Sequence, residues 1–176
     1  MSDDLKIIHY PDPRLRKKAA RVTEFTPELN AIAQKMVKLM HEDRGVGLAA
    51  PQVGLSMALF VMNPTGNPED QRVYVNPVLS DGDGSELGEE GCLSLPNIRT
   101  DVDRYLKMTI QAQDLTGKEF TETAEGFVAR IWQHEVDHLN GTLILDRMGP
   151  GTKLMFRKKI KELETAYSEK SAKAKR

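Results

Sequence analysis

The sequence predicts an α+β fold in which antiparallel β-sheets pack around a central helix, with one helix before the strands and another after the central helix. Two segments repeat apolar residues at steps of three and four, as helices do, and a segment between them alternates apolar and polar residues, as half-buried strands do. The length of 176 residues, with 39% hydrophobic and 29% charged residues, is typical of one globular domain. We therefore expect residues 1–176 to form a single domain, with a basic C-terminal helix or tail from about residue 151.

The first predicted helix follows a segment that proline interrupts. Pro11 and Pro13 break any regular element, so we expect the N-terminal segment to turn onto the surface. Thr26 is a suitable N-cap and Pro27 suits the first helical position. The apolar stripe of this helix should face the core, and Gly45 is expected to end the helix as a left-handed cap.

The middle of the chain predicts strands separated by turns. Residues 58–62 and 72–75 are expected to be strands, and the acidic, glycine-rich residues 81–90 are expected to be a loop. Residues 106–113 alternate apolar and polar side chains, so one face of this strand should be buried. A hairpin turn is expected at residues 114–117.

Two further helices are predicted in the last third of the chain. One runs from about Glu125 to Leu139 and is closed by Asn140-Gly141, and the other follows Gly149-Pro150-Gly151. Residues 151–176 hold nine Lys or Arg and three Glu, a balance of +6, whereas the whole chain has a net charge of -1. The net charge of the whole chain excludes a protein that is basic throughout and binds nucleic acid for that reason.

Targeting signals are not evident in the sequence. No apolar run approaches the roughly 18 residues that cross a bilayer. Residues 1–4 lack the basic start of a secretion signal, and no transit segment is recognisable. We therefore expect a cytoplasmic, bacterial protein without membrane partners.

A His-Glu-x-x-His motif lies inside the second predicted helix. His134 and His138 are four residues apart, so both imidazoles lie on one face and can reach one ion, while Glu135 could bond to water on that ion. Phe127 and Ile131 continue the same stripe, which indicates that the histidines point toward the interior. Short motifs of this kind also arise by chance, and two histidines do not complete a metal site.

Cys92 is the one cysteine, and two interpretations of it remain open. It is either an inert buried thiol or the third ligand of an ion that keeps one open position, as reactive ions do. Upstream, residues 45–50 are small or apolar, which is typical of backbone against which another chain or a ligand lies, and Gln52 adds an amide donor there.

These segments together resemble the peptide deformylases, metallohydrolases that remove the formyl group from the initiator methionine of nascent chains. The resemblance is carried by three boxes: Gly45-Val-Gly-Leu-Ala-Ala-Pro-Gln52, Glu90-Gly-Cys-Leu-Ser94 and Gln133-His-Glu-Val-Asp-His138. Residues 10–15 are also similar to the family, so the resemblance extends to about residue 147.

The resemblance implies a role for each matching residue. It implies that Cys92, His134 and His138 hold the metal, that Glu135 is the acid-base group, and that the Gln52 side chain and the Leu93 N–H stabilise the oxyanion. It further implies a methionine pocket lined by Val46, Gly47, Phe127 and Ile131, with Glu90 and Arg99 at its rim. Gly88 and Arg130 depart from the family, whose members often carry aliphatic residues at these two positions.

The resemblance also implies cofactor and partners. One divalent ion is expected, Fe²⁺ first, with Ni²⁺, Co²⁺ or Zn²⁺ as substitutes, and the substrate is an N-formyl-methionyl peptide. The basic tail either docks on ribosomal RNA near the exit tunnel or is a solvated helix end. Two other functions are considered: a zincin-type metallopeptidase, which would need a downstream His or Glu ligand, and a non-catalytic ribosome- or RNA-associated protein, which would need a fourth protein ligand.

Overall fold

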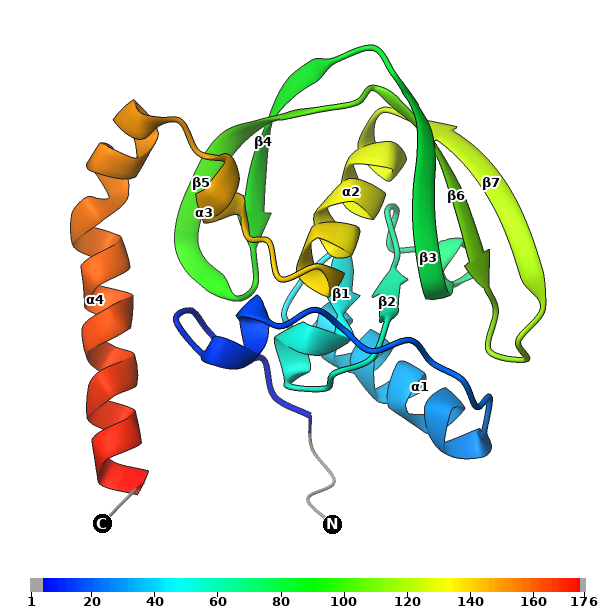
Figure 1. Ribbon diagram of the computed structural model, residues 1–176, viewed down its shortest axis with the longest axis horizontal. Coiled ribbons are helices and arrows are strands. Elements are labelled where there is room, and N and C mark those ends of the chain that lie inside the picture. The colour runs from blue at the N-terminus through cyan, green and yellow to red at the C-terminus, as the bar shows by residue number, and fades with distance from the viewer. Residues whose placement is uncertain (1–4, 175–176) are drawn as a thin grey trace.

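The computed structural model describes residues 5–174, whose strands form two antiparallel sheets (Figure 1). The larger sheet has the order β1-β2-β3-β6-β7, formed by Gly47–Ala49, Leu59–Met62, Arg72–Asp83, Lys107–Gln113 and Glu119–Glu125. The smaller sheet pairs β4 (Glu86–Cys92) with β5 (Leu95–Arg104). Both sheets are antiparallel throughout, which confirms the predicted class.

Helix α1 (Pro27–Glu42) begins where the sequence predicts but does not end as predicted. Arg44, and not Gly45, takes the left-handed conformation, with φ of 56°. The N–H of Gly45 donates to the carbonyl of Met40 at 2.8 Å and closes the helix. Glycine is needed at position 45 for a different reason, because a Cβ there would lie 2.7 Å from Cδ1 of Leu93. The glycine thus lets the segment after α1 approach the turn that follows β4.

The expected loop at residues 81–90 is wrong, because strands occupy most of it. β3 continues to Asp83 and β4 begins at Glu86. Most side chains of this stretch are exposed, so no alternation of buried and exposed residues marks it in the sequence. Gly82 fits a close approach, since a Cβ on it would lie 2.7 Å from the ring of Tyr105. The two strands form the arch above α2 in Figure 1.

Helix α2 (Phe127–Leu139) lies between the two sheets and packs against the larger one (Figure 1). Trp132 is 1% exposed and meets the ring of Tyr74 edge-on at 5.9 Å, while Tyr74 stacks on Phe60 at 4.7 Å. The predicted end is confirmed: Asn140 caps the helix and Gly141 has a φ of 74°. These aromatic contacts fix the depth and rotation of α2, and with them the direction of its histidines.

The sequence analysis expected the N-terminal segment to lie on the surface, but the structure shows that part of it is buried. The N–H groups of Ile8 and Tyr10 donate to the carbonyls of Gln52 and Ser94 at 2.8 and 2.9 Å. Leu15 is 1% exposed and belongs to a core cluster with Leu95, Ile98 and Leu143. Short 3₁₀ helices join the larger elements: η1 (Pro13–Arg16), η2 (Ala50–Val53) and η3 (Pro68–Asp70).

The chain ends in α3 (Ile144–Arg147), a single turn that the sequence did not predict, and the predicted helix α4 (Pro150–Ala174). α4 stands at the side of the molecule (Figure 1). Phe156, Ile160 and Leu163 pack against the cluster that contains Leu95, but none of the described residues of α4 is fully buried. Within residues 5–174, no helix combines the length and the apolar character that a membrane span needs.

Candidate metal centre

Three potential ligand atoms converge between the smaller sheet and α2. Sγ of Cys92 lies 3.3 Å from Nε2 of His138, which lies 3.3 Å from Nε2 of His134. All three atoms lie within 4.8 Å of one another. Cys92 comes from the end of β4, and both histidines come from the inner face of α2. The segment around Cys92 is therefore a β-hairpin.

The spacing and chemistry of these atoms fit a metal ion. Ions with bonds of about 2.1 Å to nitrogen and about 2.3 Å to sulfur hold tetrahedral ligand atoms roughly 3.4 to 3.7 Å apart. One thiolate with two imidazoles provides three protein ligands, which leaves one position for solvent or substrate. Within the described part of the chain, no fourth His, Cys, Asp or Glu joins this group.

Glu90 orients the first histidine from behind. Its Oε2 lies 2.9 Å from Nδ1 of His134, so the opposite nitrogen of the ring faces Cys92. Glu90 borders the groove, but its side chain is only 5% exposed and Arg104 pairs with it at 2.8 Å. Burial raises the pKa of Glu90, but hydrogen bonds from Arg104 and His134 outweigh burial and lower the pKa to about 2. Glu90 is therefore a buried carboxylate that fixes the ring of His134.

Glu135 is a buried carboxyl group with an oxygen free to bond. It is 3% exposed, and its Oε2 has no hydrogen-bond partner among the described residues. Burial raises its pKa to about 7, although the charge of His134 opposes this effect. A carboxyl group with a pKa near neutrality exchanges protons readily at physiological pH. The side chain also passes very close to β1, since a Cβ on Gly47 would lie 2.3 Å from Oε1.

Gln52 presents its amide N–H to the same centre. The Oε1 of Gln52 accepts a hydrogen bond from the Ala49 N–H at 2.9 Å, which fixes the orientation of the amide. Its Nε2 donates to Sγ of Cys92 at 3.5 Å and to the hydroxyl of Ser94 at 3.3 Å. Gln52 is carried by η2 and is only 2% exposed. Leu93 follows Cys92 in the hairpin turn and borders the same groove.

A groove of about 900 Å³ opens over the centre. Of the predicted site residues, the groove is bordered by Val46, Gly47, Gln52, Glu90, Cys92, Leu93, Arg99, Phe127, Ile131, His134 and Glu135. Val46 and Phe127 are 39% and 54% exposed, whereas Ile131 is 4% exposed. Arg99 pairs with Glu89 at 3.1 Å on the outer side of the hairpin. His138 does not border the groove and lies 1% exposed behind the other two ligand atoms.

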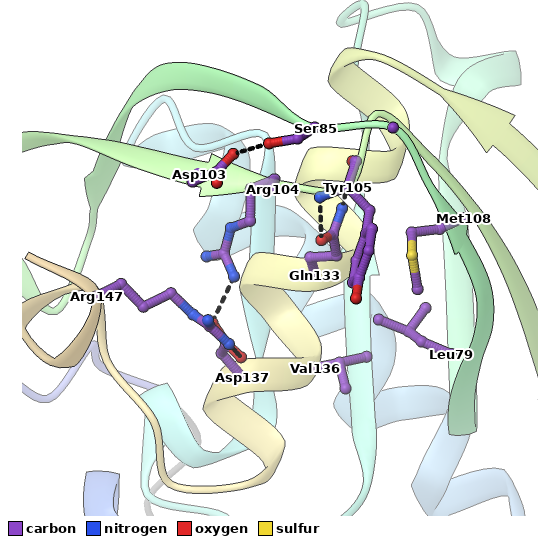
Figure 2. Close-up of a pocket in the computed structure, with 11 residues that line it drawn as sticks. Leu79, Ser85, Asp103, Arg104, Tyr105, Met108, Gln133, Val136, Asp137 and Arg147 are labelled. Carbon is purple, nitrogen blue, oxygen red and sulfur yellow. Dashed lines mark hydrogen bonds and ion pairs between the residues drawn. The ribbon is translucent and has the colours of Figure 1, made fainter.

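Figure 2 shows contacts that hold α2 at a second pocket, whose lining residues are all different from those of this groove. The amide of Gln133 bonds to both the N–H and the carbonyl of Tyr105, at 3.0 and 2.9 Å. Arg104 donates to Asp137 at 2.6 Å, and the same Arg104 pairs with Glu90. Gln133, just before the histidine motif, and Asp137, inside it, thus tie the helix to the end of β5.

The sequence analysis did not name Arg104 and named Arg130 only as a departure from the family, yet both contact Glu90. A signal for Arg104 exists in the sequence, because it continues the inward-facing alternation of Ile98 and Val102 along β5. An arginine at such a position indicates a buried ion pair. Arg130 carries no comparable signal, since a side chain of that length can reach out of a helix in many directions.

The chain is similar to known proteins over most of its length. Residues 4–153 match the family model described as polypeptide deformylase. A peptide deformylase of Acidobacterium capsulatum is 41% identical over 162 residues, which cover 91% of this chain and 95% of the relative. The crystal structure of a peptide deformylase from Legionella pneumophila has a TM-score of 0.87 and 41% identity, covering 94% of this chain and 98% of that one. For a plant peptide deformylase structure the TM-score is 0.92 at 40% identity, with coverages of 96% and 93%.

Proposed function

Because this chain belongs to the polypeptide deformylase family, whose members hydrolyse the N-formyl group of newly made peptides, we propose a role for each residue of its centre. Cys92, His134 and His138 hold one divalent metal ion, Glu135 moves the proton, and Gln52 with the Leu93 N–H binds the oxygen that gains charge. The observation that carries this proposal is the convergence of the three ligand atoms beside a buried carboxyl group.

The chemistry divides between the ion and the side chains. A bound divalent ion supplies Lewis acidity, which makes water a better nucleophile and polarises a carbonyl group. Glu135 accepts a proton from the attacking water, and a bond forms between the water oxygen and the formyl carbon. Glu135 then delivers that proton to the amide nitrogen as the carbon–nitrogen bond breaks, which leaves formate and a free amine.

Gln52 is suited to the oxyanion role because its amide is fixed before substrate arrives. The hydrogen bond from Ala49 holds Oε1, so the Nε2 donors point toward Cys92 and the groove. A donor that is held in place stabilises developing charge without reorganisation, and removal of such a donor raises the barrier by roughly 3 kcal/mol in comparable sites. We assign the Leu93 N–H the same role because it follows Cys92 directly.

The substrate side chain enters the groove beside the metal ligands. We propose that Val46, Gly47, Phe127 and Ile131 form the apolar wall for methionine, supported by their position along the groove. Arg99 contributes to the rim, where its exposed guanidinium can meet the peptide beyond the methionine. Glu90 acts indirectly, through its contact with Nδ1 of His134.

We propose Fe²⁺ as the resident ion, with Ni²⁺, Co²⁺ or Zn²⁺ as substitutes. A donor set of one thiolate and two imidazoles suits these ions, in contrast to Mg²⁺ or Ca²⁺, which prefer oxygen ligands. Anaerobic purification followed by elemental analysis tests this assignment, and a preparation active with no transition metal would contradict it.

We further propose that residues 1–176 act as one catalytic domain in the cytoplasm, with α4 as a basic element that docks on ribosomal RNA. The support for docking is the excess of basic residues at residues 151–176; on α4, Arg157, Lys158 and Lys161 border a shallow groove together with Glu162 and Glu169. Phosphate groups attract such a surface in a salt-dependent way.

The two other functions are less well supported by the same contacts. A zincin would take its third ligand downstream of His138, yet Glu164 on α4 accepts a hydrogen bond from Tyr10, and the third donor atom comes from Cys92 upstream. A purely structural metal site would need a fourth protein ligand, which the described residues do not supply.

The test combines one variant of the proton carrier with one variant of a ligand. We expect Glu135→Gln to reduce formate release from formyl-Met-Ala at least 100-fold while metal content stays near one ion per chain, because Glu135 is not a ligand. Cys92→Ala should lose the ion itself, as measured by elemental analysis.

Casein cleavage is measured in parallel with formate release. Full activity of Glu135→Gln would contradict the proton-transfer role, and unchanged metal content in Cys92→Ala would contradict the ligand assignment. Cleavage of casein without formate release would favour a peptidase.

A further inference from the structure

Arg130 crosses from α2 to the smaller sheet and is almost fully buried there, with its side chain 8% exposed. It lies one helical turn before His134. All the contacts of its guanidinium are with β4 and β5. Nη1 donates to Oε1 of Glu90 at 3.0 Å, to the Val102 carbonyl at 2.8 Å and to the Gly88 carbonyl at 3.3 Å. Nη2 donates to the Glu86 carbonyl at 2.6 Å and lies 3.5 Å from the Glu86 carboxylate. One side chain thus connects the helix that carries the histidines to the strand that carries Cys92.

Gly88 makes room for this side chain. A Cβ on Gly88 would lie 2.9 Å from Nη2 and 3.0 Å from Cζ of Arg130, closer than real Cβ atoms approach their neighbours. Gly88 has no positive φ, so its backbone alone does not demand glycine. The absence of a side chain at position 88 is therefore explained by the guanidinium that fills the space.

Glu90 is the shared target of the two arginines and of His134. A carboxylate offers about four lone-pair sites to donors. Arg104 takes two of them, from Nε to Oε1 at 2.8 Å and from Nη2 to Oε2 at 2.9 Å. Arg130 takes a further site on Oε1, and His134 takes the last on Oε2. With all four sites in use, Glu90 can neither rotate nor turn to another donor.

This arrangement specifies which ring nitrogen of His134 faces the other ligand atoms. With its other sites taken by arginine donors, Glu90 holds Nδ1 of His134 at 2.9 Å, so the ring presents Nε2 toward His138 and Cys92. Partners of this kind behind a metal-bound histidine change metal affinity by about 10- to 100-fold when removed.

We propose that Arg130 is a positioning residue of the metal centre, and that Gly88 is the residue that admits it. Arg130 holds the Glu90 carboxylate in line with His134 and draws β4, with Cys92 at its end, against α2. The inference rests on the proposed function only in treating Cys92 and the two histidines as ligands.

The experiment measures metal affinity with Co²⁺ as the probe. The dissociation constant of Co²⁺ is determined by chelator competition, followed by the visible absorbance of the thiolate-bound ion, for Arg130→Met, Gly88→Ala and the double variant. Arg130→Met keeps an unbranched apolar stem but removes the donors. Matched controls are Arg72→Met, whose guanidinium bonds only to nearby backbone carbonyls, and Gly149→Ala, where a Cβ would meet no atom within 4 Å.

We expect Co²⁺ binding to weaken at least tenfold in Arg130→Met and in the same direction in Gly88→Ala, with both controls within twofold of the unaltered protein. In the double variant the dissociation constant should match that of Arg130→Met within twofold, because the new methyl group then has no guanidinium to displace.

A merely structural clamp would lower Tm but leave the Co²⁺ dissociation constant unchanged in the folded protein, and that result would overturn the proposal. The proposal would also be overturned if the increases in the Co²⁺ dissociation constant caused by the two single substitutions multiplied in the double variant. Gly88→Ala retains every donor and charge, so it decides the matter if Arg130→Met does not fold. If the unaltered protein does not bind Co²⁺ or does not release formate, the proposed function itself is wrong, and this outcome is distinct from a failure of the Arg130 proposal.

Discussion

Glu135 shows at the scale of single residues how closely the backbone is shaped around one side chain. Its carboxyl group lies against Gly47 of β1, and a Cβ at position 47 would lie only 2.3 Å from Oε1. The sequence analysis took this glycine as part of a backbone cleared of side chains, and the structure identifies what lies against it. Glycine at this position thus preserves the location of the proposed proton carrier.

We predict that Gly47→Ala reduces kcat/KM for formyl-Met-Ala at least 100-fold, because the new methyl group displaces the Glu135 carboxyl from the ion and the formyl carbon. Steady-state formate release is the measurement, and circular dichroism reports folding. Gly151→Ala is the control, since a Cβ there would meet no atom within 4 Å and should leave the rate within twofold. A Gly47→Ala enzyme as active as the control would show that Glu135 tolerates displacement.

At the scale of secondary structure elements, β3 depends on one buried asparagine. The register of β3 with β6 shifts between Val75 and Val78, and Asn76 sits at the shift with φ of 52°. Its side chain accepts from the Val22 N–H at 2.8 Å and donates to the Val22 carbonyl at 2.9 Å and to Gln113 at 2.7 Å. The strand therefore bends here and is attached to the segment that precedes α1.

We expect Asn76→Ala to destabilise the protein by about 2 to 3 kcal/mol, because it leaves partly buried backbone groups of Val22 without these partners and places alanine at a positive φ. Urea unfolding of the metal-loaded protein measures this change. Asn67→Ala, at an exposed position, should change stability by less than about 0.5 kcal/mol. Equal stability of the two variants would mean that the bend in β3 does not need this side chain.

The sequence predicts elements best where burial alternates. The strand at residues 106–113 and the helix ending at Leu139 are confirmed within two residues because one face of each is buried. Residues 81–90 defeat the same reasoning, since their strands are exposed and held by backbone pairing that no side-chain pattern records. The left-handed turn after α1 falls on Arg44 because Gly45 is required for contact with Leu93.

The candidate centre could be predicted in part for a related reason. His134 and His138 are one helical turn apart, so local geometry alone brings them together. Cys92 joins them through tertiary folding, which only the resemblance could anticipate. The alternation along β5 places Arg104 on the buried face, but its contact with Glu90, and that of Arg130, depend on side-chain reach across three elements, which the local sequence does not encode.

At the scale of the whole molecule, charge separates α4 from the rest of the chain. Residues 151–176 carry +6, whereas residues 1–150 carry -7. α4 attaches to the body through a few apolar residues and the 3.0 Å hydrogen bond from Tyr10 to Glu164. Its outer side therefore remains free for an anionic partner.

We predict that the double variant Lys158→Ala/Lys161→Ala binds purified ribosomes more weakly and with a smaller salt dependence. Loss of two phosphate contacts should reduce the slope of log affinity against log salt by roughly 1 to 2. Co-sedimentation at several salt concentrations measures the slope. Lys107→Ala/Lys118→Ala, on β6 and the turn after it, removes equal charge from another face and should leave the slope unchanged. Identical slopes for the two double variants would contradict docking through α4.

The division of the ligand atoms between the hairpin and α2 governs when the centre can first assemble during translation. Cys92 is synthesised 42 residues before His134, so the thiol emerges while its partners are still being added. With the proposed ligand set, the growing chain could not bind the ion until α2 has also left the ribosome, and a product truncated before His138 would lack one ligand.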